Sequence, residues 1–148
     1  MATRHLSMRV EDGLVARLDE LAKQERTSRS EAARMLIEEG LRMAAHPGII
    51  FVSGPAGRRA RLARGPDVWE VAAVYRVYAH EAGRGIATTA ELTGLHPRIV
   101  EIAADYYDAY ADEIDDWLRR QDEGADAALA EWERARDIVE SHRQARSA

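Results

Sequence analysis

The feature that most constrains this chain is a short segment near its beginning, residues 4–10, in which polar and apolar residues alternate strictly. The polar set is His5, Ser7 and Arg9, and the apolar set is Leu6, Met8 and Val10. In an extended strand these two sets point to opposite faces. No other strand is expected before residue 48, and a lone strand with two unpaired edges is not stable in water. We therefore predict that the segment pairs with its own copy from a second chain, as an antiparallel ribbon.

Two amphipathic helices are expected after this segment. In the first, apolar residues recur at intervals of four and three: Leu14, Leu18 and Leu21. The second opens with Ser28 and Glu31 at the spacing of a capping box, in which each side chain binds the other residue's amide. Gly40 lies in the apolar stripe of this helix, where a glycine is costly unless another backbone comes close. A partner chain would supply that backbone.

Residues 4–45 resemble the ribbon-helix-helix domains of the CopG, Arc and MetJ kind in strand pattern, helix lengths and the Ser-x-Ser start of the second helix. The resemblance implies an intertwined homodimer whose ribbon enters the major groove of DNA. It also implies base reading by the outward strand residues at positions 5, 7 and 9. Phosphate contacts are expected from Arg4, Ser28, Arg29 and Ser30, because the start of a helix offers free amides beside hydroxyls and positive charge.

A domain boundary is predicted around Pro47, because proline disfavours helical torsions in the residue before it. A β-hairpin over residues 48–64 is expected next, with its turn at residues 54–57. The hairpin carries four arginines: Arg58, Arg59, Arg61 and Arg64. They are a candidate secondary nucleic-acid patch that would follow the backbone as a wing does. The alternative is a solvated hairpin, or ion pairs with the acidic rear of the chain.

Three helices are expected after the hairpin. Asp67 can cap the first, and Thr88 with Glu91 forms a capping box for a short second helix. A long third helix begins near Pro97, and its apolar stripe continues to Trp117. The predicted fold class is therefore mainly α with short β. It comprises a ribbon-helix-helix domain (1–45), a winged-helix-like domain of a hairpin and three helices (48–120) and a C-terminal helix (122–148).

Residues 48–120 resemble the family described as domain of unknown function 433. The matching motifs are Pro47-Gly48-Ile49, Gly57-Arg58-Arg59-Ala60, Gly65-Pro66-Asp67-Val68-Trp69-Glu70, Leu92-Thr93-Gly94-Leu95, and Tyr106-Tyr107 with Asp112-Glu113-Ile114-Asp115. The resemblance implies a bacterial or archaeal toxin-antitoxin context, in which such proteins are commonly paired with PIN-like nuclease toxins.

The C-terminal segment, residues 122–148, is predicted to form an amphipathic helix. Its candidate partner-binding residues are Leu129, Trp132, Arg134, Arg136 and Val139. Four of them share one narrow face with an aromatic anchor, which suits a groove on another protein. Arg134 or Arg136 could pair with the carboxylates of a nuclease's metal site. The alternative is a solvated helix, or one docked on its own chain.

Two further clusters of residues each have a functional and a structural interpretation. Six carboxylates suggest a metal site: Asp105, Asp108, Asp112, Glu113, Asp115 and Asp116. No His or Cys joins them at ligand spacing, and their helical spacing favours a solvated face or one that mimics nucleic acid for a basic partner. Several aromatic residues could stack on bases: Tyr106, Tyr107, Tyr110 and Trp117. Their spacing with Ile99 and Ile114 favours the core instead.

Composition restricts the remaining classes of protein. The chain has 148 residues and no cysteine, which excludes a disulfide framework and a zinc-thiolate site. Its apolar runs, such as residues 49–52, are far too short to span a bilayer. The five histidines are scattered, and neither a phosphate loop nor a nucleophile elbow is present. We expect a cytoplasmic protein that is not an enzyme, with no cofactor, no metal and no membrane contact.

The distribution of charge suggests separate surfaces for separate partners. Basic and acidic residues balance over residues 1–45, basic residues exceed acidic ones by three over 46–85, and acidic residues exceed basic ones by eight over 86–148. We predict a dimeric repressor that binds a palindromic operator in double-stranded DNA. It would also be an antitoxin whose acidic rear half and tail occlude a PIN-like ribonuclease toxin. The alternative is a stand-alone regulator whose rear domain sets the oligomeric state or binds a ligand.

Overall fold

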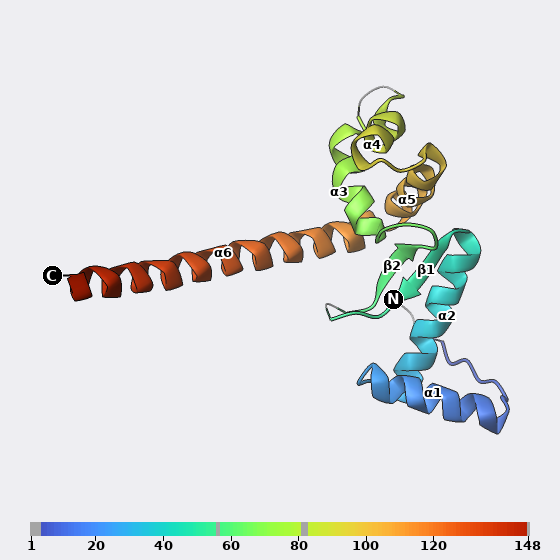
Figure 1. Ribbon diagram of the computed structural model, residues 1–148. Coiled ribbons are helices and arrows are strands. Elements are labelled where there is room, and N and C mark those ends of the chain that lie inside the picture. The colour runs from blue at the N-terminus through green and yellow to red at the C-terminus, as the bar shows by residue number, and fades with distance from the viewer. Residues whose placement is uncertain (1–3, 56, 81–82, 148) are drawn as a thin grey trace. The chain divides into compact units, whose positions relative to one another are not determined.

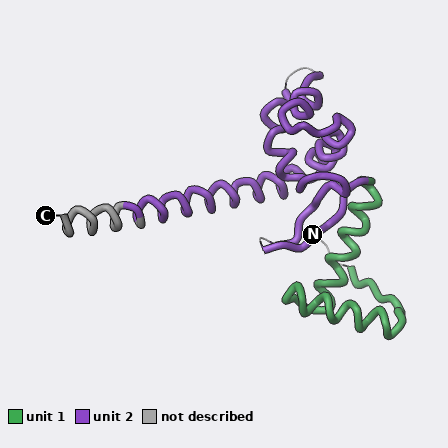
Figure 2. The backbone as a smooth tube through the Cα atoms, in the orientation of Figure 1, with its two compact units in different colours: residues 1–47 green, residues 48–148 purple. Residues whose placement is uncertain are grey.

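The computed structural model describes residues 4–55, 57–80 and 83–147, with side chains placed through residue 134 and at residue 136. Within these ranges the chain is mainly helical and contains one small antiparallel sheet of two strands (Figure 1). It divides into two compact units (Figure 2), a front unit of residues 1–47 and a rear unit of residues 48–148. The predicted fold class, mainly α with short β, is confirmed at this level.

The front unit consists of two helices that contact each other, α1 (Asp12–Gln24) and α2 (Arg29–Ala45). Ser28 caps α2, because its hydroxyl accepts a hydrogen bond from the amide of Glu31 at 3.2 Å. The reciprocal half of the predicted capping box is not formed. The carboxylate of Glu31 instead accepts a hydrogen bond from Arg34 at 2.8 Å.

A β-hairpin opens the rear unit, as predicted. β1 (Ile49–Val52) pairs antiparallel with β2 (Arg59–Leu62), with Ile49 opposite Leu62 and Val52 opposite Arg59. β2 ends two residues earlier than predicted. The chain turns back on itself there, and the amide of Leu62 donates to the carbonyl oxygen of Pro66 at 3.1 Å.

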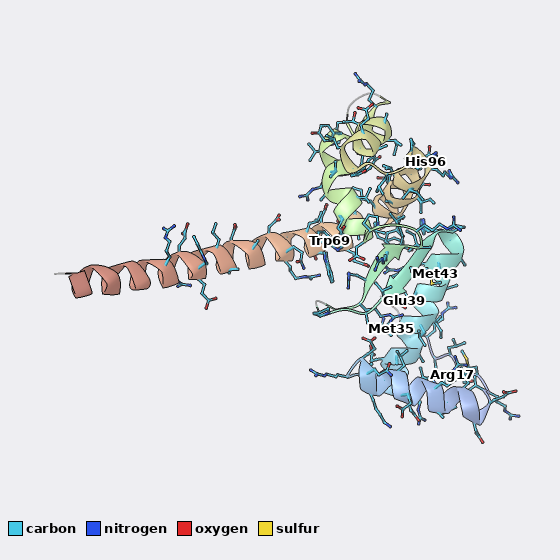
Figure 3. All side chains as sticks on the ribbon, in the orientation of Figure 1. Arg17, Met35, Glu39, Met43, Trp69 and His96 are labelled. Carbon is cyan, nitrogen blue, oxygen red and sulfur yellow. The ribbon has the colours of Figure 1, made fainter. Side chains whose placement is uncertain are left out.

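Three helices pack with the hairpin around one apolar core: α3 (Val68–Tyr78), α4 (Gly85–Thr93) and α5 (Pro97–Ala109). The largest fully buried side chains are Tyr106, Leu62, Val68, Val71, Val100 and Thr89. α4 ends at Gly94, whose φ of 69° is in the left-handed region that favours glycine. α5 begins at Pro97 as predicted, with the Nδ1 atom of His96 accepting from the amide of Arg98 at 3.1 Å (Figure 3).

Two capping predictions for the rear unit are wrong. Asp67 precedes α3, but its carboxylate makes no capping hydrogen bond, because Arg59 and Trp69 occupy it. α4 begins at Gly85, before the predicted capping box. The amide of Thr88 already donates to the carbonyl oxygen of Arg84 at 2.8 Å, so Thr88 lies inside the helix.

The predicted long helix from Pro97 is also wrong, because the chain bends at Tyr110. This residue has φ −134° and ψ 37°, and its ring lies 4.7 Å from that of Tyr106. A separate helix, α6 (Ala111–Ser147), follows and passes without a break through the predicted start of the tail. The bend places Ile114 and Leu118 in the core, so tertiary packing outweighs a uniform helical stripe. In the described part of the chain, every helix lacks the length or the apolar character that a bilayer span requires.

Candidate nucleic-acid interface

The segment predicted to form the ribbon is exposed. Residues 4–11 belong to no strand in the described single chain. Leu6, Met8 and Val10 are 69%, 60% and 42% exposed. Apolar side chains at alternate positions form one face of an extended segment, and in water such a face favours association with another apolar surface. Pairing with a second chain stays a prediction.

The helices of the front unit bury little apolar surface. Among its described residues, the buried ones are Ala22, Ala32 and Glu39. Its large apolar helical side chains that are exposed are Leu14, Leu36, Ile37, Leu41 and Met43. A unit this small must offset its conformational entropy by burying apolar area, and at about 40 residues oligomerisation is a common solution. The front unit therefore lacks a self-sufficient core.

Gly40 supports the same conclusion. Among the described atoms, nothing lies within 4 Å of a Cβ built at this position. A glycine inside a helix costs roughly 0.5–1 kcal/mol relative to alanine. The packing of this chain alone does not explain the residue, whereas a second backbone at the exposed face of α2 would.

Arg4 and the three outward residues of the ribbon segment, His5, Ser7 and Arg9, are all exposed. The structure records no hydrogen bond or ion pair between these side chains and the other described residues. Two of the four are arginines, and the first carboxylate along the chain is that of Glu11. The segment thus offers donors and positive charge without internal neutralisation.

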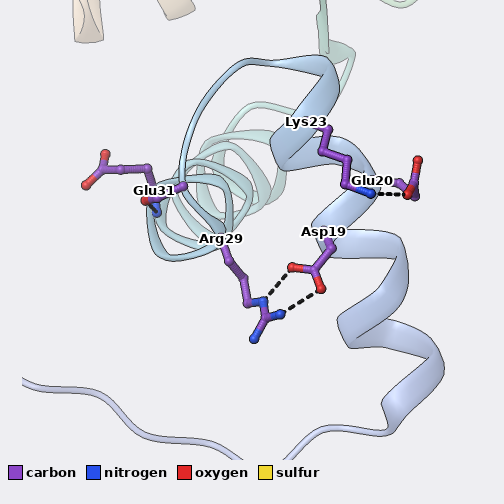
Figure 4. Close-up of polar contacts among 6 residues, drawn as sticks. Asp19, Glu20, Lys23, Arg29 and Glu31 are labelled. Atoms are coloured by element: carbon purple, nitrogen blue, oxygen red, sulfur yellow. Dashed lines mark hydrogen bonds and ion pairs between the residues drawn. The ribbon is translucent and has the colours of Figure 1, made fainter.

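The predicted phosphate site at the start of α2 is partly occupied by the protein itself. Arg29 is held by Asp19 of α1 through two contacts, Nε to Oδ1 at 2.5 Å and Nη2 to Oδ2 at 2.7 Å (Figure 4). This hydrogen-bonded guanidinium lowers the pKa of Asp19 from its ordinary value. Ser28 and Ser30 remain exposed beside the pair. A phosphate would therefore compete with Asp19 for Arg29. The Asp19–Arg29 pair was not predicted, because the two residues are ten positions apart in the sequence.

The predicted arginine patch on the hairpin is largely committed to the fold. Asp67 is buried and pairs with Arg59, while the indole nitrogen of Trp69 donates to the same carboxylate at 3.3 Å (Figure 3). Arg61 lies 3.9 Å from Asp67. Arg58 donates to the hydroxyl of Ser53 at 3.0 Å. For Arg59, these contacts favour the ion-pair alternative, with Asp67 as the partner. This arginine stabilises the junction of hairpin and α3 and is mostly buried.

Arg64, the fourth member of that patch, is exposed. Of the other three, Arg61 is also exposed but lies beside the carboxylate of Asp67, whereas Arg58 and Arg59 are partly buried. Because backbone binding needs several accessible positive charges, the hairpin is a weaker nucleic-acid candidate than the ribbon segment.

The helix-turn-helix outline of α4 and α5 does not carry a basic surface. The exposed positions of α5 include Arg98, Asp105 and Asp108. An acidic helix face is repelled by phosphates, so α5 is a poor recognition helix. Tyr106 is buried in the core, as predicted for this aromatic cluster.

The predicted acidic face continues into α6. The hydroxyl of Tyr107 donates to Asp115 at 3.1 Å, and Arg76 lies 3.4 Å from the same carboxylate. Burial, followed by the hydrogen bond to Asp115, raises the pKa of Tyr107. Among the residues described, the structure groups no three His, Cys, Asp or Glu side chains as metal ligands. These contacts fix the root of α6 to α3 and α5.

The candidate partner-binding residues of the tail lie on α6. Leu129 and Trp132 are 55% and 58% exposed, and Arg134 and Arg136 are exposed as well. The guanidinium of Arg136 lies 5.0 Å from the ring centre of Trp132. Val139, also predicted here, lies outside the residues whose side chains are described.

Comparison of the chain with known protein families, with curated protein sequences and with solved structures found no match.

Proposed function

We propose that this protein is a homodimeric DNA-binding transcriptional regulator whose front units form a ribbon-helix-helix domain. The observation that carries the proposal is the front unit's lack of a core, combined with an alternating segment whose apolar face is exposed. A second copy would bury Leu6, Met8 and Val10 and complete the packing of α2. The same pairing would bring two sets of outward polar side chains onto one narrow surface.

The outward residues suit the major groove. Arg9 can donate two hydrogen bonds to a guanine edge, Ser7 can donate or accept, and His5 offers a ring nitrogen. Arg4 and the hydroxyls of Ser28 and Ser30 would hold phosphates and set the register. The two-fold symmetry of an antiparallel ribbon predicts a palindromic operator. We assign no DNA contact to the winged-helix-like rear unit, because the exposed face of α5 is acidic.

Selection of bound sequences from a random duplex pool, followed by fluorescence anisotropy with the full chain, tests the proposal. We expect enrichment of a palindrome. Arg9→Ala should lose about 1–3 kcal/mol of discrimination between this operator and a version mutated at one base pair. Arg17→Ala is the matched control, because it removes the same charge from the exposed surface of α1 (Figure 3). No enrichment, or equal loss in both variants, would contradict the proposal.

A second candidate function is that of an antitoxin. It is favoured by the acidic excess of the rear unit, and especially by the exposed Asp105, Asp108 and Asp112 where α5 meets α6. Such a surface would complement the basic RNA path of a PIN-like ribonuclease. Co-expression with the product of the neighbouring gene, and purification through a tag on this chain, tests it. If this chain is purified without the neighbouring gene product, the antitoxin function is contradicted and the alternative, a stand-alone regulator, is supported.

A further inference from the structure

The distal part of α6 is a long helix without tertiary support from its own unit. Every side chain from Arg119 to Arg134 is exposed, whereas Ile114 and Leu118 at the root are buried. The stretch from residue 119 to the end of the helix is roughly 40 Å long at about 1.5 Å per residue. Helices in proteins draw most of their stability from packing an amphipathic face, so this stretch should gain from a partner.

An apolar stripe follows the distal helix at heptad spacing. Ala125 and Trp132 are seven residues apart, and Ala128 and Leu129 lie between them on the same face. The large exposed side chains of the stripe, Leu129 and Trp132, are set among small ones. Residues this small leave room on a facing helix for a bulky indole, and nothing among the described atoms lies within 4 Å of a Cβ at nearby Gly124.

Along one edge of this stripe, the charged residues are arranged so that two antiparallel copies of the helix place opposite charges next to each other. Asp122, Leu129 and Arg136 are each seven residues apart. Arg136 lies over the ring of Trp132, which places its guanidinium beside the stripe. In an antiparallel pair centred on Leu129, Asp122 of each copy faces Arg136 of the other. A parallel pair would instead gather two aspartates at one end and two arginines at the other.

We propose that α6 pairs with α6 of a second copy as an antiparallel coiled coil centred on Leu129. In this pair, Trp132 of each chain lies against Ala125 and Ala128 of the other, and two Asp122–Arg136 ion pairs flank the apolar seam. This contact is independent of the ribbon. If the front units also dimerise, it joins dimers into tetramers, which would place two operator-binding domains in one particle.

Sedimentation velocity of the full chain, over a dilution series, tests the pairing. Trp132→Ala should weaken the association step roughly thirtyfold or more, as expected for an interfacial tryptophan. Asp122→Arg and Arg136→Asp should each weaken it roughly tenfold, because each replaces two attractions by two repulsions. The double variant Asp122→Arg/Arg136→Asp should recover the wild-type association. Glu123→Arg is the matched control, since it makes the same charge change on the opposite face of α6 and should leave association unchanged.

The variants should change this association step in the same way whether it joins two monomers or two front-unit dimers. The experiment can therefore detect a failure of the α6 contact even if the ribbon does not form. Recovery in the double variant supports the antiparallel pair. The proposal is overturned if the double variant associates no better than the single variants, or if Trp132→Ala associates like the wild type. Binding of α6 to a different protein, with no self-association at any concentration, would also overturn it.

Discussion

The front and rear units have similarly apolar sequences but use them differently. The rear unit buries Tyr106, Val100 and Leu62 within one chain, and the hairpin and helices around them share that core. In the front unit, Leu36, Ile37 and Leu41 are 40%, 42% and 68% exposed. The rear unit thus has an apolar core within one chain, whereas the front unit leaves exposed the side chains that a second copy would bury under the proposed function. Under the proposed function, this difference predicts that folding and DNA binding are coupled in the front unit and not in the rear unit.

The largest expected effect is in the rear core. Tyr106→Ala should lower the free energy of unfolding of the rear unit by about 3–5 kcal/mol, because it removes a fully buried aromatic side chain. All three tryptophans, Trp69, Trp117 and Trp132, lie in this unit, so urea unfolding followed by tryptophan fluorescence reports on it. Leu92→Ala, at an exposed side chain of α4, is the control and should stay within about 0.5 kcal/mol of the wild type.

Ile37→Ala tests the other half of the comparison. The Ile37 side chain is 42% exposed in the single chain. If the front unit were complete, its removal would lower the free energy of unfolding by about 0.5 kcal/mol or less. If a second copy covers it, the cost should be about 2–4 kcal/mol. Circular dichroism reports the helices of both units, whereas tryptophan fluorescence reports the rear unit alone. In the Trp132→Ala background, which removes the proposed α6 contact, the circular-dichroism transition should depend on protein concentration while the fluorescence transition should not. A small, concentration-independent effect would remove the contrast between the units.

Asp67→Asn should destabilise the rear unit by about 2–3 kcal/mol, since it leaves the mostly buried guanidinium of Arg59 without its charged partner. The change is small in volume, so the effect reports the lost charge of a carboxylate that Arg59, Arg61 and the indole of Trp69 share, and not a cavity. Asp116→Asn is the control. Its exposed pair with Arg119 should contribute less than about 1 kcal/mol. Equal effects of the two variants would show that burial does not set the importance of the hairpin arginines.

The smallest effect on stability is expected from Asp19→Asn, which releases Arg29. DNA binding should tighten, and the slope of log affinity against log salt should steepen by about one charge, because Arg29 becomes available to a phosphate. The stabilising contribution of the Asp19–Arg29 pair should also depend on pH. The pKa of Asp19 is lowered in the folded chain, so the pair is complete above the ordinary carboxylate pKa and is lost as pH falls through the lowered one. Unchanged binding would indicate that the start of α2 does not contact DNA.

Local patterns predicted much of the rear unit. The hairpin, the start of α5 at Pro97 and the break at Gly94 follow from turn residues, proline and glycine, whose effects act over a few positions. The bend at Tyr110 could not be predicted in this way. No proline or glycine marks it, and it is favoured because Ile114 and Leu118 reach a core built by distant segments.

In the candidate site, too, the features that depend on adjacent residues could be predicted and those that depend on distant residues could not. The alternation of residues 4–10 and the serine cap of α2 can be read from adjacent residues, and the structure shows the cap. The pairs Asp19–Arg29 and Arg59–Asp67 join residues ten and eight positions apart across turns. Sequence spacing alone does not bring such groups together, so Arg29 was assigned to phosphates, and for Arg59 phosphate contact and ion pairing were left as alternatives.

A single cysteine at Ser7 tests the central claim most directly, because the natural chain has no cysteine. Ser7 is the middle of the alternating segment, so in an antiparallel ribbon it faces its own copy at about 4.5–5.5 Å between Cβ atoms. Under mild oxidation, Ser7→Cys should form a covalent dimer, while Ser53→Cys on the exposed hairpin turn should not cross-link. If Ser7→Cys stays uncross-linked at concentrations where the chain associates, or both variants cross-link equally, the front units do not pair through this segment.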